Sequence, residues 1–226
     1  MFSIGSAHHL MPVLALGTAA SPPPEPIVLR KTVLEAIKLG YRHFDTSPRY
    51  QTEEPLGEAL AEAVSLGLVQ SRSELFVTSK LCCVDVHVCQ SSGISPVWQQ
   101  RKLRELCKSK GIVVTAYSVL GSRGAFWGTH KIMESDVLKE IAVAKGKTVA
   151  QMSMRWAYEQ GVSMVVKSFK KERPEENLKI FDWSLTEEEK QRISTEISQS
   201  RIVDGEVYIS ENGSIKSVTE MWDGEI

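Results

Sequence analysis

The chain has 226 residues, of which 42% are hydrophobic and 24% are charged, which is the ordinary range for a globular protein with a sizeable core. Its formal net charge of -1 provides no overall attraction to nucleic acid or to an acidic membrane surface, so we expect neither as a partner. No run of apolar residues is long enough to cross a bilayer, and the 4 cysteines do not suggest a disulfide framework, so we expect a cytoplasmic protein.

Strand and helix patterns alternate from the start of the chain. The apolar segment 10–16 holds Pro12 and lacks a preceding basic run, so we interpret it as a strand and not as a targeting segment. Helices are indicated where apolar residues recur on one face, as at Leu29, Val33 and Ile37. In the first part of the chain these patterns predict strands at 14–18, 43–46 and 75–80 and helices around 29–37 and 56–64.

The second part of the chain repeats this alternation. A helix with Leu103 and Leu106 on its apolar side ends at Gly111 and also carries Cys107, which we expect in the core. The spacing of Thr186 and Glu189 predicts a capping box that begins the last helix. The other predicted elements are strands at 112–116 and 164–166 and helices at 136–144 and 149–160.

The choice between two parallel-sheet folds depends on the segment after the first strand. Repeated βα units form either a doubly wound sheet or a barrel. A doubly wound dinucleotide-binding domain places G-x-G-x-x-G after its first strand, and the sequence after Gly17 contains no such motif. We therefore predict an α/β fold of the TIM (β/α)8 type, in which active sites lie at the carboxyl ends of the strands.

Three residues with complementary chemistry stand at those strand ends. Asp45 ends the second strand, Tyr50 lies in the loop after it, and Lys80 ends the third. A phenol is a weak acid at neutral pH, so a tyrosine that protonates a carbonyl oxygen needs a nearby cation. Lys80 can be that cation, and Asp45 can keep it charged and oriented. Each residue taken alone also has an ordinary structural explanation, but together they predict a catalytic group that titrates as a coupled set.

The segments around these residues carry a family resemblance. Residues 43–60 read HFDTSPRYQTEEPLGEAL and residues 76–81 read FVTSKL, and both closely resemble the aldo-keto reductases. The Gln-Thr-Glu-Glu variant is similar to the plant branch that includes codeinone reductase, methylecgonone reductase and chalcone reductase. The resemblance implies a barrel enzyme that transfers hydride from NADPH to an aldehyde or ketone. It assigns the catalytic roles to Tyr50, as the general acid, and to Lys80 and Asp45.

A basic turn near the carboxyl end resembles the family's site for the adenosine 2'-phosphate of NADPH. Lys167 supplies a compact charge and Arg173 a planar guanidinium, a pair that suits a phosphate monoester and so favours NADPH over NADH. A solvated basic turn before a helix is the alternative explanation. The residues implied here are Lys167, Ser168, Arg173, Glu176 and Asn177.

Two other segments resemble parts of the family that contact the rest of the cofactor. Segment 117–122 is similar to the loop after strand seven, where a tyrosine stacks on the nicotinamide and the loop wraps the pyrophosphate. Val119 stands in place of the usual proline, which loosens the turn without removing a contact group. The cofactor-binding residues implied by these matches are Thr18, Asp45, Tyr117, Ser118, Leu120 and Ser122.

The middle of the family pattern is absent from this sequence. The family's Ile-His-Trp-Pro, Val-Ser-Asn-Phe and Asn-Gln-Val-Glu motifs do not occur, so the resemblance implies an incomplete barrel with strands 1-2-3-7-8 retained and strands 4-5-6 missing. We expect one domain over residues 1–226, with an aberrant junction at 82–97. The family's substrate-orienting histidine and its nicotinamide ligands fall in the missing part, and among the five histidines only His87 lies near the expected active rim.

Three classes of function remain open from the sequence. The chain is an active reductase of small aldehydes or ketones, a non-catalytic relic that still binds the nucleotide, or an unstable fragment that acts through protein partners. Open strand edges also predict self-association. Zinc is a fourth consideration, but the adjacent cysteines make poor chelators and the spacing is not C-x2-C, so we predict no metal site at Cys82, Cys83, His87 and Cys89.

Overall fold

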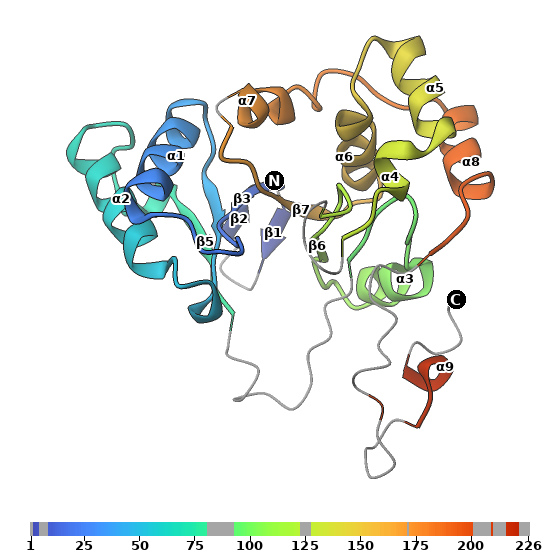
Figure 1. Ribbon diagram of the computed structural model, residues 1–226, viewed down its shortest axis with the longest axis horizontal. Helices are drawn as coiled ribbons and strands as arrows, with labels where there is room; N and C mark the ends of the chain where they lie inside the picture. The colour runs from blue at the N-terminus through green and yellow to red at the C-terminus, as the bar shows by residue number, and fades with distance from the viewer. Residues whose placement is uncertain are drawn as a thin grey trace. The chain divides into compact units, whose positions relative to one another are not determined.

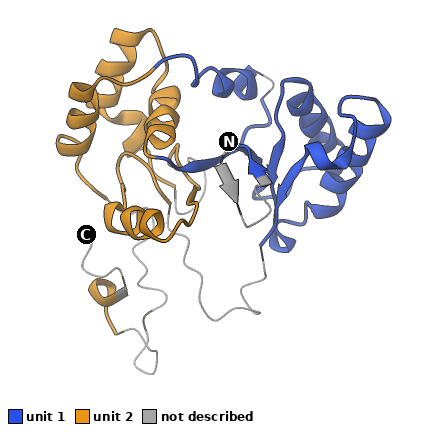
Figure 2. Cartoon of the chain, turned by 180° about the vertical axis from the view of Figure 1, so that it is seen from behind, with its two compact units in different colours: residues 1–91, 161–183 blue, residues 92–160, 184–226 orange. Residues whose placement is uncertain are grey.

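The structure is a computed structural model that describes residues 2–4, 9–80, 93–122, 128–170, 172–200, 209 and 216–221. The chain divides into two compact units, unit 1 with residues 1–91 and 161–183 and unit 2 with residues 92–160 and 184–226 (Figure 2). The expectation of one domain stays a prediction. Residues 81–92, which include most of the predicted junction and the Cys82 to Cys89 cluster, lie outside the described residues, as does most of the tail after 200.

Unit 1 is built on four parallel strands in the order β5-β4-β3-β7 (Figure 1). Leu14 lies opposite Met164, so the first parallel strand pairs with the last one of this unit, and His43 lies opposite Phe76. A closed barrel requires this adjacency of strand eight to strand one. The four strands of unit 1 thus have the neighbours that the predicted barrel requires. The strands are β3 Leu14–Gly17, β4 His43–Asp45, β5 Phe76–Thr78 and β7 Ser163–Val166.

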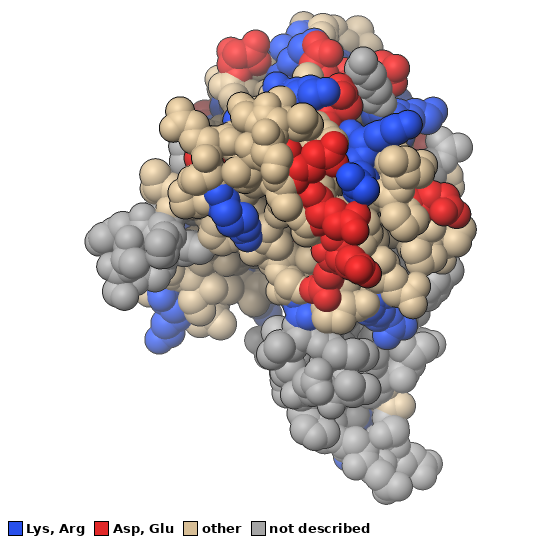
Figure 3. Space-filling model, turned by 90° about the vertical axis from the view of Figure 1, so that its left-hand side faces the viewer, with Lys and Arg blue, Asp and Glu red and all other residues tan. Residues whose placement is uncertain are grey.

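Two long helices of unit 1 pack against each other beside the strands (Figure 1). The predicted apolar face of the first helix, Leu29, Val33 and Ile37, is buried in full. Arg30 reaches from it to Glu62 of the second at 2.7 Å. Figure 3 shows acidic side chains gathered on this side of the molecule. The helical elements are α1 Pro26–Lys38, α2 Glu53–Ser65, α7 Glu172–Leu178 and the short turns η1 Pro48–Tyr50 and η2 Arg72–Glu74.

Unit 2 is mainly helical in its described part. The predicted capping box is present, since the Thr186 hydroxyl accepts from the Glu189 amide at 3.2 Å and the Glu189 carboxylate accepts from the Thr186 amide at 2.7 Å. Trp156, Leu138 and Ile193 lie in the core. The elements are α3 Arg101–Ser109, β6 Thr115–Ala116, α4 Lys131–Glu134, α5 Asp136–Lys145, α6 Val149–Glu159, α8 Glu187–Thr195 and α9 Val218–Met221.

Two details of the sequence interpretation were wrong. The apolar segment 10–16 is not one strand, because β2 (His9–Met11) pairs antiparallel with β1 (Phe2–Ile4) and ends before Pro12, and β3 begins only at Leu14. Proline lacks the amide hydrogen that a continuous ladder needs. Cys107 is only half-buried, and Leu106 beside it is 57% exposed, because α3 buries none of its residues.

No helix within the described ranges is both long enough and apolar enough to cross a membrane.

Candidate active site

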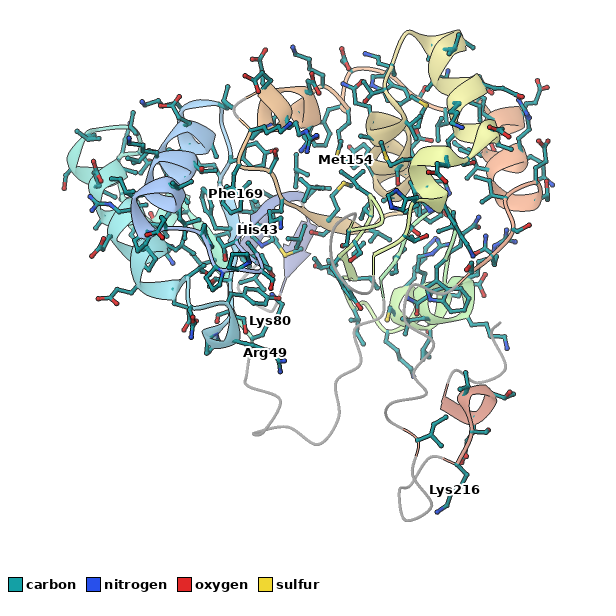
Figure 4. All side chains as sticks on the ribbon, in the orientation of Figure 1. His43, Arg49, Lys80, Met154, Phe169 and Lys216 are labelled. Atoms are coloured by element: carbon teal, nitrogen blue, oxygen red, sulfur yellow. The ribbon has the colours of Figure 1, made fainter. Side chains whose placement is uncertain are left out.

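Asp45 and Lys80 form an ion pair where the neighbouring strands β4 and β5 end. Figure 4 labels Lys80 in this part of unit 1. The Lys80 ammonium donates to both carboxylate oxygens of Asp45 at 2.6 Å and to the backbone oxygen of Thr46 at 3.1 Å. The Asp45 side chain is 8% exposed, whereas that of Lys80 is 41% exposed. The Asp45 carboxylate is therefore held inside the protein, whereas the side chain of its partner Lys80 extends to the surface.

The turn after β4 places the aromatic ring of Tyr50 beside this lysine. Ser47 is extended and its hydroxyl accepts from the Arg49 amide at 3.4 Å, and the Tyr50 amide donates to the Ser47 oxygen at 2.9 Å. Gln51 then adopts a left-handed conformation, with φ of 55°, which ends the turn. The Lys80 ammonium lies 5.0 Å from the centroid of the Tyr50 ring. A cation at this distance from an aromatic ring makes a cation–π contact with it.

Burial sets the electrostatics of β4 around this group. It raises the pKa of the Asp45 carboxyl, and the hydrogen bond and charge of Lys80 oppose that shift. Burial also lowers the pKa of His43 on the same strand. The Nδ1 of His43 lies 2.9 Å from the Pro12 oxygen and must carry the proton, because a carbonyl only accepts. Because the lowered pKa keeps the ring neutral, its Nε2 accepts from the Thr78 hydroxyl at 2.8 Å, and His43 is a structural histidine.

Three buried threonines around Asp45 complete this region, and only Thr18 was singled out from the sequence. The hydroxyl groups of Thr18 and Thr52 lie 2.7 Å apart, and those of Thr52 and Thr46 lie 3.0 Å apart. The Thr18 hydroxyl donates to the backbone oxygen of Asp45 at 3.1 Å. Thr46 and Thr52 stand inside the family-like string, but a threonine in a polar turn gives no sign of burial.

The predicted 2'-phosphate segment begins where β7 ends. Lys167 and Arg173 are both exposed, with the Lys167 ammonium 5.9 Å from the centroid of the Phe169 ring. The Ser168 side chain is buried, and its hydroxyl accepts from the Lys170 amide at 3.1 Å. The segment therefore presents Lys167, Lys170 and Arg173 to solvent, on a backbone that Ser168 holds in place.

The buried side chain of Tyr41 bonds to helix α7. The Tyr41 hydroxyl donates to the Pro174 oxygen at 3.2 Å, and burial raises the pKa of this phenol while a hydrogen bond with Asn177 opposes the rise. Asn177, a predicted cofactor contact, is itself buried. Arg173 and Glu176 occupy the exposed side of α7.

The predicted pyrophosphate loop belongs to unit 2 and has an unusual backbone. Ser118 and Ser122 both have left-handed conformations, with φ of 57° and 50°, and their hydroxyl oxygens lie 2.5 Å apart. Gly121 has φ of 84°, and a Cβ there would lie 2.5 Å from the Thr129 oxygen. Val119 is buried, so packing holds the turn where the family has proline. Non-glycine residues with a left-handed backbone conformation are strained, and they are frequent at ligand sites.

The predicted site residues thus fall into two sets. The structure pairs Lys80 with Asp45, places the Lys80 ammonium 5.0 Å from the centroid of the Tyr50 ring, and bonds the Thr18 hydroxyl to the Asp45 backbone oxygen. No group of three or more potential metal ligands occurs among the residues that the structure describes. Unit 1 holds Thr18, Asp45, Tyr50, Lys80, Lys167, Ser168, Arg173, Glu176 and Asn177, and unit 2 holds Tyr117, Ser118, Leu120 and Ser122.

Parallel strands whose carboxyl ends carry an acid and a lysine, with a tyrosine in the next turn, fit the active-site edge of a barrel enzyme. The model of the Aldo/keto reductase family matches residues 13–96 and 87–197. The chain belongs to the aldo/keto reductase family and is, by that membership, an NADP-dependent oxidoreductase.

Plant enzymes are among its relatives. The chain is 41% identical over 312 residues to (1S)-1,7-diacetoxy-luvungin A aldo-keto reductase of Citrus sinensis, covering 99% of this chain and 97% of the relative. It is also 41% identical over 317 residues to deoxymugineic acid synthase 1 of Zea mays, covering 100% of both. The predicted similarity to plant members of the family is confirmed, and the codeinone reductase-like branch stays a prediction.

A solved structure supports the fold. The crystal structure of the Bombyx mori aldo-keto reductase in complex with NADP superimposes with a TM-score of 0.74, covering 88% of this chain and 93% of that one. The sequence identity is 24%, so the likeness establishes the fold only. The predicted TIM-barrel class is confirmed, and the strands described in unit 1 form an open arc of it.

Proposed function

We propose that this chain is an NADPH-dependent reductase of small aldehydes or ketones in which Tyr50 is the general acid. The observation that carries the proposal is the position of the Lys80 ammonium, which contacts the Asp45 carboxylate at 2.6 Å and lies 5.0 Å from the centroid of the Tyr50 ring. When bound, the cofactor supplies a hydride to the carbonyl carbon and leaves as NADP+. The Tyr50 hydroxyl gives its proton to the carbonyl oxygen, the product is an alcohol, and solvent returns the proton to the phenolate.

Lys80 and Asp45 have distinct roles in this proposal. Lys80 lowers the energy of the phenolate that forms as the proton leaves Tyr50, because its charge is already in place before the reaction. Asp45 keeps Lys80 in that position, since both of its oxygens accept from the ammonium. Because the Asp45 side chain is fixed by burial, the lysine does not have to be ordered during the reaction.

The exposed cations after β7 suit the 2'-phosphate of NADPH. Replacing Lys167 or Arg173 with alanine is expected to weaken NADPH binding by about tenfold to a hundredfold, because each change removes a charge-assisted hydrogen bond. NADH binding should change little, since NADH lacks this phosphate. Quenching of tryptophan fluorescence by each nucleotide measures both constants. Lys170→Ala, an exposed lysine of the same segment, is the matched control, and an equal loss for NADPH and NADH would contradict the assignment.

We further propose that the family's middle strands 4-5-6 are missing. Support comes from the length of the alignment, because 312 aligned positions with the Citrus enzyme exceed the 226 residues of this chain by 86. The same observation favours a second function, nucleotide binding without turnover, since the substrate-orienting histidine and the nicotinamide ligands of the family belong to that part. His130 is exposed and within 3.9 Å of Glu134, and His87 lies outside the described residues.

One purified sample separates these functions. We expect a cooperative thermal transition whose midpoint rises with NADPH, because a ligand that binds only the folded state stabilises it. A reductase then oxidises NADPH when an aldehyde or ketone is added, and the absorbance of NADPH falls. A rise in midpoint without turnover would leave the nucleotide-binding function, and a melt with no cooperative transition and no nucleotide effect would eliminate both.

We also propose a cytoplasmic location and self-association. The first rests on composition and cysteine use, and the second on β5, which stands at one end of the strand order in unit 1. Size-exclusion chromatography at several protein concentrations tests the second.

A further inference from the structure

A chain of three buried hydroxyl groups joins the elements that hold the proposed catalytic group. Thr18, Thr46 and Thr52 are each at most 2% exposed. Thr18 follows β3, Thr46 follows β4, and Thr52 immediately precedes α2. The turn that carries Tyr50 runs from Thr46 to Thr52, so the hydroxyl contact of 3.0 Å between these two residues closes the turn across its base.

The hydrogen bonds of this chain run in one direction. The backbone oxygen of Asp45 only accepts, so the Thr18 hydroxyl must donate to it. The single proton of Thr18 is then committed, and the contact of 2.7 Å with Thr52 requires Thr52 to donate. The same reasoning makes Thr46 the donor to Thr52. The Thr52 hydroxyl therefore donates to Thr18 and accepts from Thr46. Of these three hydroxyl groups, it is the one that bonds to both of the others.

The Thr52 hydroxyl makes no capping bond to α2. A threonine before a helix normally accepts a hydrogen bond from an amide of the first turn, as Thr148 and Thr186 do from the third residue of their helices. The third residue of α2 is Pro55, which has no N–H to donate, and no side-chain cap is formed at Thr52. The hydroxyl is therefore not engaged by the helix, and its bonds to Thr18 and Thr46 tie the start of α2 to the strand ends.

We propose that Thr52 is a positioning residue for the reductase reaction. Its hydroxyl fixes the base of the Tyr50 turn against the ends of β3 and β4, and thereby sets where Tyr50 stands relative to the Asp45–Lys80 pair. Thr52 does not touch the reacting atoms. The inference rests on the proposed function of Tyr50 for its catalytic consequence, but the ordering of the turn can be measured without turnover.

The test compares Thr52→Val, which keeps the shape and removes the hydroxyl, with Thr52→Ser, which keeps the hydroxyl. Thr52→Val is expected to lower kcat by about tenfold to a hundredfold through misplacement of Tyr50, with the binding of NADPH and the KM for the carbonyl compound little changed. Thr52→Ser should restore most of the rate. Thr32→Val is the control, because the Thr32 hydroxyl donates to the Val28 oxygen of its own helix in an exposed part of α1.

Amide hydrogen exchange provides the second measurement. The Tyr50 and Gln51 amides, which donate to Ser47 and Pro48, should exchange about tenfold faster in Thr52→Val and at the normal rate in Thr52→Ser. Thr46→Val should have a smaller effect, since it leaves the bonds from Thr52 to Thr18 and on to Asp45 intact. It also serves if Thr52→Val does not fold.

The outcomes separate the two proposals. A wild-type protein without turnover would defeat the proposed reductase, while slower exchange in wild type than in Thr52→Val would still support Thr52 as the residue that orders the turn. Unchanged exchange in Thr52→Val would overturn the inference, as would a Thr52→Ser variant that behaves like Thr52→Val, or a Thr32→Val control that loses the same rate.

Discussion

Carbonyl reduction by the Tyr50→Phe variant is expected to be slower by about a hundredfold to ten thousandfold, which is the usual contribution of a general acid. The change removes only the hydroxyl. The ring stays beside the Lys80 ammonium, which lies 5.0 Å from its centroid, so the turn should keep its conformation. NADPH binding should be preserved, because no predicted contact with the 2'-phosphate changes. The rate is followed by NADPH absorbance with an aldehyde in excess.

The matched control for this variant is Tyr158→Phe. Tyr158 lies on α6 in unit 2, with the Arg155 guanidinium 5.0 Å from the centroid of its ring, so this pair of variants compares hydroxyl loss at a proposed acid with hydroxyl loss elsewhere. Equal rates in wild type and Tyr50→Phe would remove Tyr50 from the mechanism, whatever the control does.

Lys80→Met is expected to lose both activity and stability at neutral pH. It leaves the Asp45 carboxylate, with a side chain 8% exposed, without its cation. Breaking a fully buried pair costs about 3–5 kcal/mol, and we expect about 2 kcal/mol because Lys80 itself is partly exposed. Urea unfolding at pH 7 measures the loss. The double variant Asp45→Asn/Lys80→Met should recover most of that stability and none of the activity.

The pH dependence of Lys80→Met has a definite sign. Burial raises the pKa of Asp45, and without Lys80 the main opposing influence is gone, so the folded state of the variant binds a proton more tightly than the unfolded state. A raised pKa of an acid favours folding at low pH, and this contribution is lost as pH rises through the folded value. The deficit in the free energy of unfolding should therefore be largest near pH 7 and shrink toward pH 4. A deficit that stays constant over this range would contradict the account.

The fold was largely predictable from the sequence because its signals are local and agree with each other. The apolar spacing of Leu29, Val33 and Ile37 gave a helix face that is buried in full, and the Thr186–Glu189 spacing gave a real capping box. The segment 10–16 was interpreted wrongly because hydrophobicity continues through Pro12 although the hydrogen-bond ladder cannot. The set of retained strands was inferred from the family resemblance and not from any local pattern.

The site could be predicted only for residues with catalytic side chains that stand at the ends of predicted strands. Asp45 and Lys80 were expected to meet because they end neighbouring strands, and they do. The involvement of Thr52 could not be predicted, because its hydroxyl bonds to a residue 34 positions away and its position before a helix suggests a cap. Likewise, the sequence does not reveal that Pro12 and Thr78 fix the tautomer of His43. Both hydrogen bonds are tertiary contacts.

The pairing of β3 with β7 has a consequence for the order in which this protein takes shape. Leu14 and Met164 are adjacent in the sheet, so the ribosome must deliver the chain to at least residue 166 before the earliest parallel strand acquires its second neighbour. Until then one edge of β3 is unpaired, and residues 92–160 of unit 2 leave the ribosome during that time. Contacts of such long sequence separation form late and slowly, so we expect the open edge of β3 to be exposed to other chains during synthesis.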